Sequence, residues 1–311
     1  MPATRWGLTV PFGGVALADH ADLFRRAEAA GYDDLWSAET NGYDGFTPLA
    51  VAAVHTERMR LCTGIVNPFT RGPALLAQQA AALADLSRGR FVLGLGASSN
   101  VIVERWNEIV FEKPLTKVRE SVATMRSVLA GGRGPGGFKL ETAPAYEIPI
   151  VVAALRGRML GLAAEVAEGT FTNLLPLSGV PQVVEAFGAP DKELACRFFC
   201  VPQPEDEGLA FAKFMFVAYA TVPVYAAFYR WLGWGERIEP MVEAWNARER
   251  QRALELVPDE LVREIYLFGS PAQMRARLDA FAERGVSTHV LTPLCGPDEL
   301  PAFIDGLAPN R

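Results

Sequence analysis

Small and hydrogen-bonding residues recur in this chain directly after short apolar runs that are typical of strands. The segments that end these runs are Ala38-Glu39-Thr40, residues 63–67, Gly96-Ala97-Ser98, Ala153-Ala154, Thr172-Asn173 and Leu291-Thr292. Small side chains allow a flat ring to approach the backbone, and Ser, Thr and Asn can hydrogen bond to its polar edge. The pattern therefore predicts a cleft for a planar cofactor with few catalytic side chains.

Two acidic residues could transfer a proton at such a cleft. Glu39 ends the second strand-like run, and Glu108 lies in a longer segment after the fourth. A carboxylate at the carboxyl end of a barrel strand can serve as a general acid or base. Glu39 could equally cap or pair in a loop, and Glu108 could be solvated. Both are kept as candidate catalytic residues.

Sequence motifs of other enzyme classes are incomplete or absent. Gly94 and Gly96 follow a strand-like run, but Ser99 replaces the third glycine of a dinucleotide fingerprint, and the unit is the fourth in the chain. The sequence contains no G-x-S-x-G, P-loop or H-E-x-x-H motif. Three scattered histidines, and four cysteines without a C-x-x-C pair, predict no metal site.

Charge and hydropathy limit the partners and the location. The formal net charge is -6, and lysines and arginines do not cluster with aromatic residues, so we expect no nucleic-acid partner. The chain begins without the long apolar region of a signal peptide, so we expect a cytoplasmic protein. Residues 214–234 are as apolar as a membrane span but contain Pro223 and Arg230. We therefore expect a buried or pocket-lining helical insertion and no membrane partner.

The elements that must position these residues alternate between strands and helices. Strand-like runs occupy 7–11, 34–39, 61–66, 91–95, 150–153, 170–173, 194–201 and 288–292, and helical patterns lie between them. This order in 311 residues predicts a single-domain (β/α)8 TIM barrel over 1–311, with insertions after several strands. A doubly wound open sheet is the alternative, because periodicity does not distinguish an open sheet from a closed one.

Three longer segments exceed what a minimal barrel needs. They span 98–114, 131–146 and 205–267. The last is rich in aromatic residues and follows the seventh strand, so it should emerge on the same face as the candidate site. We expect its residues 205–234 to form a helical roof in which Tyr225 and Phe228 bind the substrate. The alternative is that its aromatic residues pack in the core or in a dimer interface.

Residues 63–99, TGIVNPFTRGPALLAQQAAALADLSRGRFVLGLGASS, resemble the luciferase-like monooxygenase superfamily. Within it they resemble the branch of coenzyme F420-dependent oxidoreductases that includes methylenetetrahydromethanopterin reductase. DLWSAET, FEKPLTKVRES, PIVVAALRGRMLGLAAEVAEGTFTN and GSPAQMRARLDAFAERGVSTHVL fit the same family, so the likeness covers most of the chain. The third-strand motif is the most specific, whereas flavin-binding members share the C-terminal one.

The resemblance implies a binding site for the deazaflavin ring of coenzyme F420 at the barrel mouth. A bulge with a non-proline cis peptide at Gly64-Ile65 would support the back of the ring. Arg156 or Arg158 would help to bind the cofactor phosphate at a helix N-terminus. The expected cofactor-binding set is Thr63, Gly64, Ile65, Asn67, Gly96, Ala97, Ser98, Ala153, Ala154, Arg156, Gly157 and Asn173.

The sequence departs from one pattern in the superfamily. Some members that oxidise sugars carry Asp-His at the end of the second strand, where this chain has Glu39-Thr40. No histidine base stands at that position, which argues against a sugar-dehydrogenase reaction. The proton donor stays open among Glu39, Glu108 and solvent.

We therefore expect an F420-dependent oxidoreductase that transfers a hydride between C5 of the cofactor and a small organic substrate. An apolar, aromatic roof favours a hydrophobic substrate over a sugar phosphate. An FMN-dependent luciferase-like monooxygenase is the first alternative, and a non-catalytic barrel that binds a flavin is the second. The resemblance also implies a homodimer.

Overall fold

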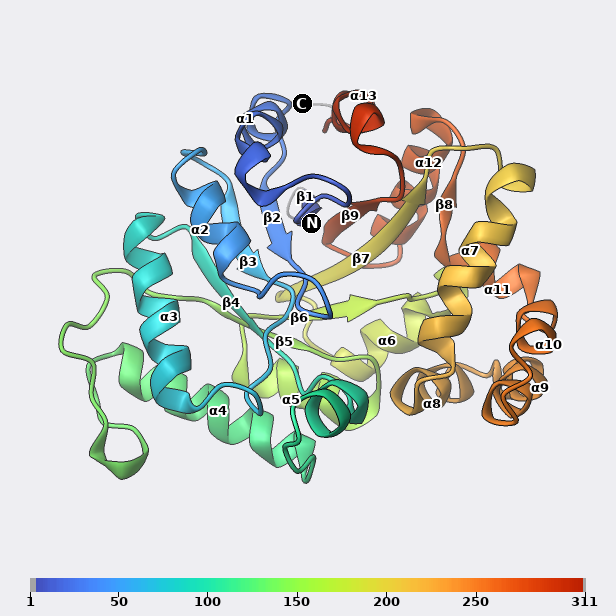
Figure 1. Ribbon diagram of the computed structural model, residues 1–311. Helices are drawn as coiled ribbons and strands as arrows, with labels where there is room; N and C mark the ends of the chain where they lie inside the picture. Colours follow the sequence, from blue (N-terminus) through green and yellow to red (C-terminus); the bar gives the residue numbers. More distant parts are fainter. Residues whose placement is uncertain (1–3, 310–311) are drawn as a thin grey trace.

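Eight parallel strands close into a barrel in the computed structural model, which describes residues 4–309 (Figure 1). The strands are β1 (Arg5–Val10), β2 (Asp34–Ser37), β3 (Arg60–Thr63), β4 (Phe91–Leu95), β5 (Ile150–Ala153), β6 (Gly169–Asn173), β7 (Glu193–Val201), β8 (Leu267–Phe268) and β9 (Thr288–Pro293). Strands β1 to β7 pair in sequence order, and β9 joins β7 to β1. The short β8 only extends the pairing of β7. The predicted (β/α)8 barrel is therefore confirmed, and the open sheet is excluded.

Helices alternate with the strands and surround the barrel (Figure 1). They are α1 (Ala21–Ala29), α2 (Thr47–Ala53), α3 (Pro73–Leu86), α4 (Pro114–Leu129), α5 (Gly157–Val166), α6 (Val180–Phe187), α7 (Glu205–Ala220), α8 (Pro223–Trp231), α9 (Gly235–Asn246), α10 (Arg250–Glu255), α11 (Asp259–Ile265), α12 (Pro271–Ala282) and α13 (Leu300–Gly306). Arg26 on α1 pairs with Asp305 on α13, so the last helix packs beside the first and completes the outer ring.

Alternation along the strands divides the barrel interior into layers. The middle layer is packed and apolar, and it consists of Trp36, Cys62, Val92, Val151, Phe171, Ala195 and Val290. The next inward positions toward the carboxyl ends of the strands are small or polar: Thr9, Ala153, Asn173, Arg197 and Thr292. The barrel mouth is therefore lined by hydrogen-bonding groups above a closed core.

Charged residues fill the opposite, N-terminal end of the barrel. Asp34 is fully buried and accepts hydrogen bonds from Arg60 at 2.7 and 2.8 Å and from Arg5 at 2.6 and 3.3 Å. Arg60 also donates to Glu193 at 2.7 and 3.1 Å, and the Thr288 hydroxyl donates to Glu193 at 2.5 Å. This network joins β1, β2, β3, β7 and β9 below the apolar layer.

Helices α7 to α11 form an insertion beside β7 and β8 (Figure 1). Helices α7 and α8 meet at a bend of 102°, between Ala220 and Pro223. Within residues 4–309 no single helix is long and apolar enough to cross a membrane, and only this bent pair meets that criterion when its two helices are taken together.

Candidate active site

The third strand ends in a bulge at the barrel mouth. β3 stops at Thr63, although the predicted strand ran to residue 66, and the Gly64-Ile65 peptide bond that follows is cis. Val66 then returns to the sheet through a single bridge to Leu95. The predicted cis peptide is therefore confirmed.

Thr63 is the last residue of β3. Its side chain is fully buried, and its hydroxyl donates to the Gly94 carbonyl at 2.9 Å and accepts from the Gly94 N–H at 2.7 Å. Both bonds tie β3 to β4 next to the bulge. Because the hydroxyl is already paired in both directions, Thr63 helps to build the barrel wall, and its predicted place beside the cofactor ring stays a prediction.

Ile65 and its neighbours make a flat floor at the mouth. A Cβ atom at Gly96 would lie 2.9 Å from side-chain atoms of both Ile65 and Ala153. A Cβ atom at Gly94 would lie 1.8 Å from the Thr63 carbonyl oxygen. Both positions require glycine, because only a residue without Cβ allows β4 to approach the bulge so closely.

Polar residues after β3 and β4 shape the edges of this floor. Asn67 is buried, and its side-chain oxygen accepts from the N–H groups of Phe69 and Thr70 at 3.2 and 2.9 Å. Asn67 therefore forms the turn after the bulge, and its predicted contact with the cofactor stays a prediction. Ala97 and Ser98 are half-buried where the chain leaves β4.

Glu39 lies at the mouth end of β2, and its carboxylate is already engaged. Arg71 donates to its two oxygens at 2.5 and 2.6 Å, and the Gly45 N–H donates at 2.7 Å. The Glu39 and Arg71 side chains are only 15% and 12% exposed. A bidentate pair in a partly buried place is a strong contact. Glu39 therefore links the loops after β2 and β3, in agreement with the alternative that it pairs in a loop.

Glu108 follows a π-helical segment, Val101–Trp106, in the connection after β4. Its side chain is exposed, and its carboxylate makes no ion pair or hydrogen bond with the rest of the described chain. Of the two candidate acids, Glu108 is thus the one whose carboxylate has no partner within the described chain.

The N-terminus of α5 follows directly after β5. Ala154 is buried, whereas Arg156, Gly157 and Arg158 are exposed. Neither arginine side chain has a partner among residues 4–309. The first N–H groups of a helix are unpaired and carry the positive end of its dipole. The arrangement suits an anionic group such as a phosphate, and the predicted contacts remain predictions.

Asn173 connects the barrel to the helical insertion through a residue that the sequence analysis did not single out. Arg197 on β7 lies opposite Asn173 in the β6–β7 register, and its Nε donates to the Asn173 side-chain oxygen at 3.0 Å. The Asn173 side-chain nitrogen donates to the Tyr225 hydroxyl on α8 at 2.7 Å. The sequence did contain a signal for Arg197, because it is a charged residue at an inward-facing position of the otherwise apolar strand-like run 194–201.

The two aromatic residues that were predicted to bind substrate lie in different surroundings. Tyr225 reaches the mouth through Asn173, and burial raises the pKa of its hydroxyl although the charge of Arg197 opposes that shift. Phe228 is 0% exposed and packs against Tyr229 and Trp231 inside the insertion. The enclosed ring favours the alternative that Phe228 packs in the core of the insertion, and its predicted substrate contact stays a prediction.

Comparison with known sequences gives a family for this fold and site. The model of the family described as "Luciferase-like monooxygenase" matches residues 4–288 of this chain. Over 331 aligned positions the chain is 29% identical to a Mycobacterium tuberculosis protein named "Putative coenzyme F420-dependent oxidoreductase", and 92% of each chain is covered.

Solved structures share the fold at lower sequence identity. Coenzyme F420-dependent tetrahydromethanopterin reductase from Methanopyrus kandleri matches with a TM-score of 0.77 and 24% identity, over 98% of this chain and 97% of that one. The FMN-bound oxygenating constituent of 3,6-diketocamphane monooxygenase from Pseudomonas putida matches with a TM-score of 0.67 and 16% identity, over 99% of each chain. Together with the family match over residues 4–288, the barrel and its cis bulge establish that this chain belongs to the luciferase-like monooxygenase family.

Proposed function

We propose that this chain is a coenzyme F420-dependent oxidoreductase that transfers a hydride between the deazaflavin and a small organic substrate. The observation that carries the proposal is the bulge at Gly64-Ile65, where Ile65 packs against Gly96 and Ala153 as a flat floor in the barrel mouth. The likeness over 92% of the chain to a protein named for coenzyme F420 favours a deazaflavin on that floor.

The residues at the mouth fit the two chemical parts of this cofactor. The floor suits the planar ring, because glycine and alanine leave room for close contact. Arg156, Arg158 and the N–H groups that begin at Gly157 suit its phosphate and anionic tail. The deazaflavin supplies the hydride chemistry at C5 when bound. The chain's own residues bind it, orient the substrate and exclude water.

The ion pairs at the site also bear on proton transfer. Both oxygens of Glu39 accept hydrogen bonds from Arg71, and one of them also accepts from Gly45, so the carboxylate is already engaged. We therefore place the proton transfer with Glu108 or with solvent. An FMN-dependent monooxygenase remains the second candidate function, because an FMN-bound structure shares the fold over 99% of the chain.

Titration of the purified protein with F420 and, separately, with FMN tests the cofactor. We expect tighter binding of F420, followed by reduction of the bound deazaflavin when a suitable alcohol or other hydride donor is added. Equal or tighter binding of FMN with consumption of oxygen would support the monooxygenase instead. Binding without turnover for any donor would support a flavin-binding barrel.

A pair of glycine variants tests the floor itself. Gly96→Ala adds a Cβ atom 2.9 Å from Ile65 and Ala153, so it should displace the floor and weaken F420 binding at least about tenfold, which corresponds to about 1.4 kcal/mol. Gly161→Ala in α5 is the matched control, because a Cβ atom there meets nothing within 4 Å. Equal F420 affinity for both variants would contradict the proposed ring position.

We also propose that the enzyme is a homodimer, as the family resemblance implies. Sedimentation velocity of the purified protein measures this directly. A single monomeric species at micromolar concentration would contradict it.

A further inference from the structure

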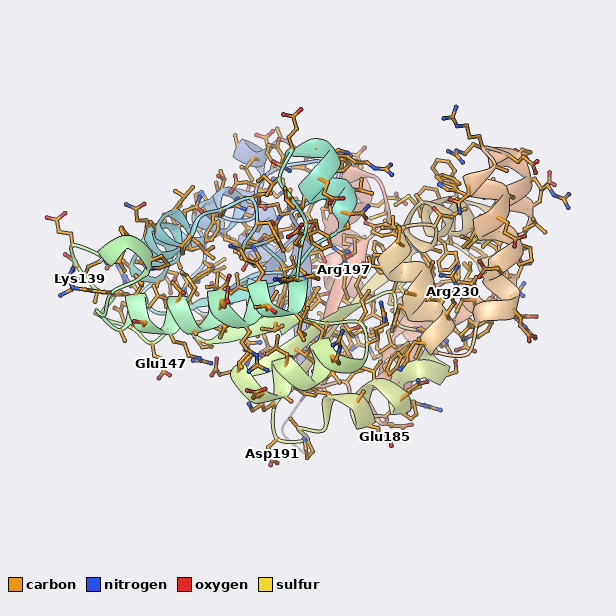
Figure 2. The ribbon with its side chains drawn as sticks, turned by 90° about the horizontal axis from the view of Figure 1, so that it is seen from below. Lys139, Glu147, Glu185, Asp191, Arg197 and Arg230 are labelled. Atoms are coloured by element: carbon orange, nitrogen blue, oxygen red, sulfur yellow. The ribbon has the colours of Figure 1, made fainter. Side chains whose placement is uncertain are left out.

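Arg197 is a buried cation without a counter-ion among the described residues. Its exposed fraction is 9%, and no acidic side chain of residues 4–309 lies within ion-pair distance. Figure 2 shows it in the interior of the molecule, whereas Lys139, Glu185 and Asp191 project from the outside. Its guanidinium carbon lies 5.1 Å from the centre of the Phe199 ring. A buried guanidinium with no carboxylate partner is costly unless a ligand compensates its charge.

The free hydrogen-bonding groups of Arg197 are all donors. Its Nε donates to Asn173, and its two terminal nitrogens make no hydrogen bond within the described chain. Neither terminal nitrogen is among the unpaired side-chain atoms that are sealed from solvent, so both face accessible space. An arginine side chain has no acceptor, so only an acceptor can complete its hydrogen bonds.

The direction of the hydrogen bonds to Tyr225 follows from this chemistry. Because Arg197 can only donate, the Asn173 side chain must turn its oxygen toward Arg197 and its nitrogen toward Tyr225. The Tyr225 oxygen is therefore the acceptor of that bond at 2.7 Å. Its own O–H proton is left for another acceptor.

A second tyrosine hydroxyl close by lacks a partner. The Tyr266 hydroxyl is buried and makes no hydrogen bond with residues 4–309, and its ring lies 5.6 Å from that of Phe199. The rings of Tyr219 and Tyr225 meet edge to face at 5.6 Å, and Tyr219 lies 6.0 Å from Phe199. The Phe199 ring beside Arg197 thus belongs to a cluster of aromatic rings, in which the Tyr225 hydroxyl keeps an unused proton and the Tyr266 hydroxyl is sealed from solvent.

We propose that Arg197, Asn173 and Tyr225, here called the arginine–tyrosine site, bind the carboxylate of an organic acid substrate. The assignment rests on the proposed function, because it names the substrate class for the same barrel mouth. A carboxylate offers two acceptor oxygens that match the two free nitrogens of a guanidinium. The surrounding rings accommodate an apolar body behind the carboxylate. This refines the expected hydrophobic substrate to an amphipathic one.

Titration calorimetry with benzoate as the probe tests the site in the F420-loaded protein and in the protein without cofactor. Benzoate has a carboxylate and a flat apolar body, and benzamide is the matched probe without the charge. We expect benzoate to bind at least about tenfold more tightly than benzamide, since hydrogen bonds to charged groups are the stronger class. Equal binding of the two probes would overturn the proposal.

Variants of the site identify the residue responsible. Arg197→Met should weaken benzoate binding about ten- to a hundredfold, and Tyr225→Phe should weaken it severalfold. Arg284→Met is the control, because Arg284 is a surface arginine that precedes the N-terminal end of β9. Removal of an unpaired buried charge should not lower the melting temperature of Arg197→Met. Unchanged benzoate affinity, or a large fall in melting temperature, would contradict the assignment.

Two outcomes of the titration distinguish a substrate carboxylate from the acidic tail of F420, and distinguish failure of the carboxylate site from failure of the proposed function. If saturating F420 displaces benzoate, the site binds the cofactor's own acidic tail, and the substrate assignment is overturned. If F420 fails to bind while Arg197-dependent benzoate binding persists, the proposed function fails and the carboxylate site stands.

Discussion

The charge network at the N-terminal end of the barrel makes a strong prediction about stability. Asp34 is completely buried, and its two oxygens accept four hydrogen bonds, two from Arg5 and two from Arg60. Asp34→Asn preserves the size of the side chain but removes its charge. The two guanidinium groups then lose the buried anion that compensates them.

The size of the effect follows from the burial. Breaking a buried ion pair by removing one charge costs about 3–5 kcal/mol. An unfolding entropy of about 2.1 cal/mol/K per residue gives about 0.65 kcal/mol/K for 311 residues. Asp34→Asn should therefore lower Tm by about 5–8 °C. Asp22→Asn is the control, because the Asp22 side chain is 94% exposed and its pair with Arg25 should contribute less than about 1 kcal/mol.

The same network predicts how the effect depends on pH. Burial by itself would raise the pKa of Asp34, but the hydrogen bonds and charges of Arg60 and Arg5 outweigh it and hold the pKa below its ordinary value. A lowered pKa stabilises the folded state fully above the unfolded pKa of about 4, and this contribution is lost as the pH falls through the folded pKa. The difference between the wild type and Asp34→Asn should therefore narrow in acid.

Thermal unfolding of the three proteins at neutral and acidic pH measures both effects. A loss below about 1 kcal/mol for Asp34→Asn at neutral pH would refute the reasoning, because it would mean that the two arginines do not depend on the buried charge. A difference that widens in acid would refute the sign.

Three further predictions concern the site and the core. Arg156→Ala and Arg158→Ala should each weaken F420 binding, most clearly at low salt, because salt screens the attraction between the arginine and the phosphate. Fluorescence titrations with F420 measure this. If neither variant changes the affinity or its salt dependence, neither arginine contacts the phosphate. Phe228→Ala should cost about 3–5 kcal/mol in thermal unfolding with F420 affinity retained, since the ring is 0% exposed, and a changed KM at unaltered Tm would support its substrate role. Burial lowers the pKa of His289 to about 3, so its stabilising effect is complete above pH about 6.5 and declines toward pH 3. Between these pH values the unfolding free energy of the wild type should fall by up to about 1.4 kcal/mol more per pH unit than that of His289→Leu. Chemical unfolding curves with equal pH dependence for the two proteins would contradict this.

Local patterns in the sequence were sufficient for much of the fold. The order of strands and helices follows from periodicity and from glycine and proline, as at α3, which spans Pro73–Leu86 between the third and fourth strand-like runs and begins at a proline. The cis peptide at Gly64-Ile65 was predicted from a family motif contained within a few residues. These features depend on neighbours along the chain, so the sequence alone carries them.

Partner choice between distant segments was decided only by the tertiary structure. Glu39 is paired by Arg71, 32 residues away, and Asn173 lies between Arg197 and Tyr225, 24 and 52 residues away. An aromatic side chain such as Phe228 would suit a roof over the substrate, but in the folded chain the bent insertion encloses it. Periodicity predicts which face of an element is apolar, and it does not specify which residue of another element meets that face. For that reason the sequence by itself determined the family and the barrel, whereas the closed structure decided which carboxylate is bound and which cation is left for a ligand.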